Sequence, residues 1–137
     1  EFLTAYRALT ERGIRVCVHL INGLPGETED MMLETASAVG LLRPGGVKIH
    51  LLHILSGTRL AHEWESGTVP MLTREEYIRI VCRQLLRLPP ETVVERLTGD
   101  GAKEFLLAPL WSRDKIAVLG GIDRFLAEHN LWQGCLF

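Results

Sequence analysis

The sequence predicts an α/β fold in which about three parallel strands are covered by helices. Two short aliphatic runs, residues 14–22 and 47–55, end abruptly in turn residues, as strands buried in a parallel sheet do. Segments with helical spacing of apolar residues alternate with the strands, which implies right-handed crossovers between parallel neighbours. Three strands are too few for a closed barrel, so the sheet is either small and open or an arc of something larger.

The first half of the chain is predicted to hold two helices and the first strand. Residues 2–12 form a helix that ends before Gly13, and the strand 14–22 follows it. Thr28 begins the next helix, because its side chain can accept a hydrogen bond from a free amide of the first turn. The apolar side of this helix consists of Met32, Ala36 and Val39.

The second half is predicted to begin with the strand 47–55 and a short helix at 60–65. Thr73 and Glu76 have the spacing of a capping box, and the helix that they begin ends at the prolines 89–90. A third strand is predicted at 92–97, and one or two helical turns at 103–107. Ser112 is predicted to cap a last helix that runs to Glu128, with a buried side made by Ile116, Leu119, Ile122 and Leu126.

Composition indicates one globular core with no general affinity for nucleic acid. The chain has 137 residues, of which 47% are hydrophobic, and a net charge of -2. No apolar run reaches the roughly 18 residues that cross a bilayer, and no leader opens the chain, so we expect a cytoplasmic protein without membrane contact. Cys17, Cys82 and Cys135 are too few and too widely spaced for a disulfide framework or a zinc site, which predicts buried free thiols.

The start of the chain suggests a piece of a longer protein. It opens with Glu1 rather than Met, and apolar residues already follow at helical spacing from Phe2. A barrel cut at this place leaves a strand edge and an apolar face without partners. We therefore expect the chain to self-associate, with two arcs facing each other.

Polar residues on one side of the two best strands predict a functional face. Side chains alternate along a strand, so Lys48 and His50 share one side of the second strand, and His19 and Ile21 share one side of the first. The opposite sides are apolar and would pack on helices. A buried charge without partners is strongly unfavourable, so the mixed sides are expected to face a polar cavity, as in the wall of a barrel with a working interior.

Under the alternative, these are hydrogen-bonded core histidines and Lys48 reaches solvent at an open edge. His62 and His129 are expected at the surface, and His53 is assigned no role.

Several stretches resemble radical S-adenosylmethionine (radical SAM) enzymes. Residues 20–28, LINGLPGET, are similar to the fifth-strand motif of that family, and residues 52–60 are similar to the end of its sixth strand. The stretches 88–90, 96–100 and 108–112, with Lys115, resemble the YhcC-like Fe-S oxidoreductases, a branch related to the catalytic subunit of Elongator. The resemblance covers nearly the whole chain.

This resemblance implies the later half of a partial (β/α)6 TIM-like barrel. Residues 1–88 would be barrel-derived βα units, and residues 89–137 the C-terminal strand and helices. In such enzymes a CxxxCxxC loop holds a [4Fe-4S] cluster that reduces S-adenosylmethionine to methionine and a 5'-deoxyadenosyl radical. That triplet is absent here, and no metal ligands are assigned. The resemblance thus implies that the parent protein is an enzyme. This chain alone is expected to bind neither the cluster nor S-adenosylmethionine and to perform no radical chemistry.

The family's binding residues carry over to named positions of this chain. The fifth-strand contact to the adenine falls on Ile21, with Asn22 and Gly23 beside it, and the sixth-strand contact falls on Leu52 and His50. A stricter form of the motif has glycine where this chain has His19, whose imidazole would point into the cavity. The candidate substrate contacts are His19, Lys48, Arg96 and Asp100; a structural ion pair is an equal alternative for the last two.

Two hypotheses of different classes follow. The favoured one is the C-terminal half of a radical SAM oxidoreductase, whose partner is the missing N-terminal half of the barrel. A tRNA substrate follows only by analogy with Elongator. The other is a non-catalytic α/β binding or interaction module, whose mixed strand faces are filled by structural polar pairs.

Overall fold

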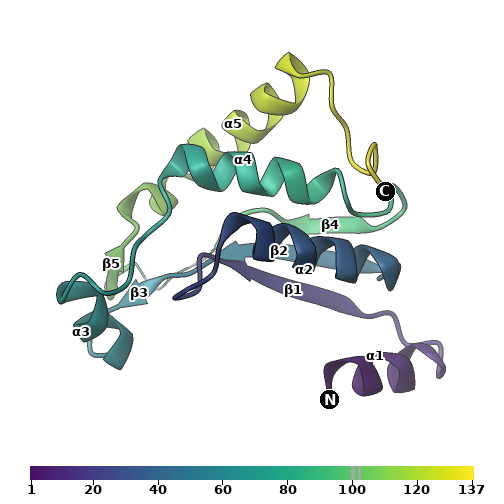
Figure 1. Cartoon of the computed structure of the whole chain (residues 1–137), viewed down its shortest axis with the longest axis horizontal. Helices are drawn as coiled ribbons and strands as arrows, with labels where there is room; N and C mark the ends of the chain where they lie inside the picture. Colours follow the sequence, from purple (N-terminus) through teal and green to yellow (C-terminus); the bar gives the residue numbers. More distant parts are fainter. Residues whose placement is uncertain (100, 102) are drawn as a thin grey trace.

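The computed structural model describes residues 1–99, 101 and 103–137. Three parallel strands form the main sheet in the order β1 (Cys17–Asn22), β2 (Gly46–Leu51) and β4 (Val93–Arg96). A small antiparallel sheet of β3 (Ile54–Leu55) and β5 (Leu106–Ala108) lies beyond the arrowheads of β1 and β2 (Figure 1). The predicted α/β fold with parallel strands is confirmed.

Helices cover one face of the main sheet. The helices are α1 (Phe2–Thr10), α2 (Glu29–Leu41), α3 (Arg59–Glu65), α4 (Arg74–Leu85) and α5 (Lys115–Glu128), with a 3₁₀ turn at Leu110–Arg113. In Figure 1, α2 and α4 lie over the same face, α5 packs on α4, and α1 stands near the start of β1. None of the helices in the described part of the chain is long and apolar enough to cross a bilayer.

Local sequence signals set most helix starts. Thr28 accepts a hydrogen bond from the Met31 amide, and Thr73 forms the predicted capping box with Glu76. At the end of α1, Gly13 has a φ of +72°, and the amide of Ile14 donates to Leu9 O over 3.1 Å, as in a Schellman motif.

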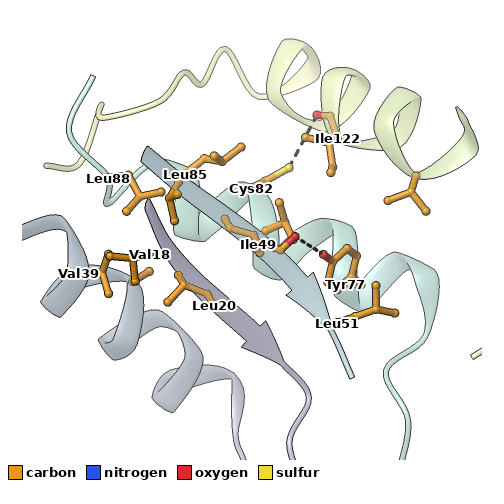
Figure 2. Close-up of a cluster of buried hydrophobic side chains, with 14 of the residues drawn as sticks. Val18, Leu20, Val39, Ile49, Leu51, Tyr77, Cys82, Leu85, Leu88 and Ile122 are labelled. Carbon is orange, nitrogen blue, oxygen red and sulfur yellow. Dashed lines mark hydrogen bonds between the residues drawn. The ribbon is translucent and has the colours of Figure 1, made fainter. Parts of the chain in front are cut away.

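The main core lies between the sheet and the helices α2 and α4. Successive strand residues alternate, so Val18 and Leu20 of β1 and Ile49 of β2 are buried under the helices (Figure 2). The predicted side of α2, Met32, Ala36 and Val39, is also buried. The Cys82 thiol lies in this core and donates to Ile122 O over 3.7 Å, which ties α4 to α5.

The two predicted strands are shorter than the apolar runs that indicated them. In the first run, pairing begins only at Cys17, opposite Gly46 where β2 starts, and Ile14 is left 49% exposed. The second run leaves the main sheet at Leu52. Its last residues, Ile54 and Leu55, pair with β5, and Ile54 is buried in a second small core with Ala61, Val69 and Ala108.

That pairing also explains a wrong prediction downstream. Residues 103–107 were predicted as helical turns, but Leu106–Ala108 is a strand, because Ile54–Leu55 offers its backbone as an antiparallel partner. Periodicity within so short a segment carries no information about that distant partner.

The last helix begins later than predicted and turns a different side inward. Asp114, not Ser112, caps α5, because Ser112 belongs to the 3₁₀ turn, where its hydroxyl donates to Pro109 O. The fully buried residues are Val118 and Ile122, whereas Ile116 is 85% exposed and Leu119 is exposed. The prediction was right for Ile122 and wrong for Ile116 and Leu119.

Candidate functional site

The face of the main sheet away from the helices is polar, as the alternation predicted. Neighbouring residues in the register are His19 with Lys48, and Ile21 with His50. The imidazole rings of His19 and His50 lie with their centroids 5.3 Å apart, and Ile21 is 49% exposed. This face therefore combines imidazoles with an accessible aliphatic side chain.

An open pocket of about 420 Å³ lies at the carboxyl ends of these strands. In parallel α/β sheets, ligands bind at this end of the strands. The pocket brings together five of the predicted site residues and three others: His19, Ile21, His50, Leu51, Leu52, His53, Arg96 and Gly99.

His50 has an unfilled hydrogen-bonding position in this pocket. Its Nε2 atom is buried and has no hydrogen-bond partner among the described residues. Burial lowers the pKa of His50, and the nearby His19 and Arg96 lower it further. A neutral imidazole with a buried unpaired nitrogen is unfavourable on its own, so a polar ligand group at this nitrogen would relieve the cost.

Lys48 does not line the pocket. Its ammonium lies 3.6 Å from Glu95 Oε2, and Arg15 lies 3.5 Å from Glu95 Oε1. This group of three sits on the same polar face, nearer the start of the strands, and Gly46 leaves the space that the Glu95 carboxylate occupies. The structure thus gives Lys48 an ion pair with Glu95, whereas the alternative reading of the sequence expected Lys48 to reach solvent at an open edge.

The Asn22 side chain points to the opposite face of the sheet. It is 2% exposed and pairs with Gln84, each amide donating to the other over 2.8 Å. Gly23 follows with a φ of +82°, and the Glu27 carboxylate accepts from the amides of Gly23 and Leu24. The GLPGE stretch therefore builds a turn closed by its own glutamate. Asp100 lies outside the described residues.

The sequence reasoning missed His53. Its Nε2 lies 3.2 Å from Ser112 Oγ, and its ring occupies the space beside Gly99 and Gly101, where a Cβ on Gly99 would lie 2.4 Å from the imidazole. Gly99 and Gly101 are the sequence signal that corresponds to this packing. They could not be matched to His53, because the break after β2 was not predicted.

The described residues contain no group of three or more His, Cys, Asp or Glu side chains that could hold a metal ion. The three cysteines are free, and Cys82 is in the helical core. The described residues therefore do not provide the set of ligands that an iron-sulfur cluster needs. By contrast, the pocket is lined by both apolar and polar side chains.

We expect the fold to lose stability as the pH falls from about 7.5 to about 5.5. Burial lowers the pKa of both His50 and His53 below the ordinary value of 6.5, and His19, Lys48, Arg96 and His53 face His50. The unfolded chain then binds more protons below about pH 6.5, so acid favours unfolding until the folded-state pKa values are passed. Denaturant titrations across this range should show a smaller loss for His50→Gln; a wild-type midpoint that stays constant would contradict the prediction.

A parallel arc with helices on one face and an open pocket at the strand ends has the architecture of a piece of an α/β barrel. The family model of the Radical_SAM C-terminal domain matches residues 44–128, and the chain belongs to that family. It is 46% identical to the YtqA protein of Bacillus subtilis and 36% identical to the YhcC protein of Escherichia coli K12, over 99% and 92% of this chain. The predicted membership of the radical SAM superfamily is confirmed.

The chain spans 42% of YtqA and 41% of YhcC, so it corresponds to less than half of each relative. Its fold is similar to that of the archaeal Methanocaldococcus infernus Elp3, with a TM-score of 0.81 at 19% identity, covering 96% of this chain and 31% of Elp3. The fold class predicted from the sequence, the later half of a partial TIM-like barrel, agrees with this likeness.

Proposed function

We propose that this chain is the C-terminal part of a radical SAM Fe-S oxidoreductase and forms one wall of its S-adenosylmethionine and substrate pocket. The supporting observation is the pocket at the carboxyl ends of β1, β2 and β4, on the face that none of the described helices covers. The three free cysteines are compatible with the reducing cytoplasm, where we place the protein.

The pocket residues suit a nucleoside. Ile21 and Leu52 offer aliphatic surface for a flat heteroaromatic ring, and the buried Nε2 of His50 offers a hydrogen bond. Bound beside a [4Fe-4S] cluster, S-adenosylmethionine would supply a 5'-deoxyadenosyl radical. The cluster ligands would come from a CxxxCxxC loop of the parent protein, and the residues of this chain would bind and orient the nucleoside.

The test uses the longer parent protein. Anaerobic reconstitution with iron and sulfide should give the absorption of a [4Fe-4S] cluster and release of 5'-deoxyadenosine. Ile21→Ala should raise the Kd for S-adenosylmethionine about 10-fold, the equivalent of about 1.4 kcal/mol of lost apolar contact. Leu41→Ala, at a residue that is 79% exposed on α2, is the matched control and should leave the Kd unchanged.

Two results would overturn the proposal. A parent protein without a CxxxCxxC loop, or one that forms no cluster, would favour a non-catalytic binding module. Equal Kd values for Ile21→Ala and Leu41→Ala would remove this pocket from the cofactor site.

We also propose that the preceding half of the barrel docks on the β1 edge and on α1. In the part of the chain that the structure describes, β1 pairs with β2 alone, so its other edge has no strand beside it. Phe2, Leu3 and Ile14 are each about half exposed nearby. Unpaired edges and apolar patches of this kind bind partners.

The isolated chain should therefore self-associate through this surface. Light scattering at tens of micromolar is expected to give a dimer or a larger species. Leu3→Glu should shift the mass toward the monomer, because it places a charge in the apolar patch, whereas Leu41→Glu on α2 should not. A wild-type chain that stays monomeric would contradict the prediction.

A further inference from the structure

The hydrogen bonds around His53 determine which ring nitrogen carries its proton. The Ser112 hydroxyl donates to Pro109 O over 2.7 Å, and it has a single proton to give. At 3.2 Å from His53 Nε2, the same oxygen can only accept. The neutral imidazole therefore carries its proton on Nε2 and a lone pair on Nδ1.

The ring is also held in place by packing. A Cβ at Gly99 would lie 2.4 Å from its Cε1, and a Cβ at Gly101 would lie 3.1 Å from its Nδ1. A side chain at residue 99 would force this ring to move, and one at residue 101 would press against it. Ser112 is 5% exposed, so the acceptor that fixes the tautomer is itself buried.

His53 belongs to the pocket wall, and Nδ1 is its one ring nitrogen that Ser112 does not contact. Both His53 and Gly99 line the pocket, and no described residue forms a hydrogen bond with Nδ1. Burial lowers the pKa of His53, which keeps the ring neutral near pH 7. His53 is therefore a fixed hydrogen-bond acceptor beside His19, His50 and Arg96.

We propose that His53 Nδ1 accepts a hydrogen bond from a hydroxyl or amino group of the substrate, and that Ser112 is the positioning residue that fixes its tautomer. An acceptor of fixed direction on a half-buried ring selects ligands that present a donor, because a bound ligand without one would cover the nitrogen and leave it unpaired. The proposal deepens the proposed function, since it names the kind of group that the same pocket recognises.

The tautomer is tested by ¹⁵N NMR of the imidazoles in this chain, which requires neither cluster nor cofactor. At neutral pH the His53 signals should show a protonated Nε2 and an unprotonated Nδ1. Ser112→Ala should convert them to a mixture of tautomers, and Ser66→Ala, at an exposed serine after α3, should leave them unchanged. A proton on His53 Nδ1 in the wild type would overturn the proposal.

Recognition is tested with two small probes, D-ribose as a hydroxyl donor and acetate as a ligand that only accepts. D-ribose should shift the His53 Nδ1 signal and the Gly99 amide, and acetate should not. His53→Gln, which retains a donor for Ser112 but lacks Nδ1, should lose the shift of the Gly99 amide while keeping the thermal midpoint. The proposal would be overturned if only acetate shifted these signals or if neither probe did. It would also be overturned if His53→Gln kept the shift of the Gly99 amide. Because this chain is used alone, failure here is distinct from failure of the parent protein to form a cluster.

Discussion

Tyr77→Ala is expected to lower the free energy of unfolding by about 3–5 kcal/mol, the usual loss when a large buried aromatic side chain is removed. Tyr77 is completely buried on α4, and its ring packs on Trp111 with centroids 5.5 Å apart (Figure 2 shows its place against β2). Its hydroxyl donates toward Leu97 O at 3.0 Å, with Ile49 O at 3.4 Å. Removing it would break the contacts of α4 with β2 and with the residue that follows β4.

Urea denaturation followed by circular dichroism measures this loss. Tyr77→Phe keeps the ring and removes only the hydroxyl, so it should cost about 1 kcal/mol. Phe105→Ala is the aromatic control at a residue that is 53% exposed, and it should cost well under 1 kcal/mol. If Tyr77→Ala were no more damaging than Phe105→Ala, the core between α4 and the sheet would be assigned wrongly.

The parallel sheet and the pocket at its end followed from patterns within single strands. Alternation fixed the sides of His19 and Ile21 on β1 and of His50 on β2, because side-chain direction in a strand has a period of two whatever the strand pairs with. These three residues indeed line one pocket. Membership of the family rested on the order of several motifs, and the sixth-strand motif carried Leu52 to this pocket. Arg96 was predicted from its place at the end of the third strand, and it also lines the pocket.

The errors fall where a distant partner decides the outcome. His53 lies one residue after Leu52, and only the antiparallel pairing of β3 with β5, which begins at Ile54, shows that the chain has left the sheet there. Ser112 looked like a helix cap because it precedes an apolar segment, but its hydroxyl binds Pro109 O and its neighbour is His53. No local pattern contains those contacts.

Asn22 shows how a motif residue can support the pocket from the opposite face of the sheet. Gln84 of α4 pairs with Asn22 and also donates to Met32 O of α2 over 3.1 Å. The pair therefore joins the end of β1 to both covering helices, directly beneath Ile21 and Gly23. These hydrogen bonds hold the strand end and the GLPGE turn in place beside the pocket.

Asn22→Leu is accordingly expected to cost about 2–3 kcal/mol of stability, because it leaves the buried side-chain amide of Gln84 without its hydrogen-bond partner. Gln84→Leu should cost a similar amount, since it leaves the buried amide of Asn22 unpaired and removes the hydrogen bond to Met32 O. The double variant should lose less free energy of unfolding than the two single variants together. Removing both polar partners leaves neither buried amide unpaired. Urea midpoints of the four proteins give this coupling energy. Strictly additive losses would show that the two amides do not act as a pair, and the link between the β1 end and the helices would then lie elsewhere.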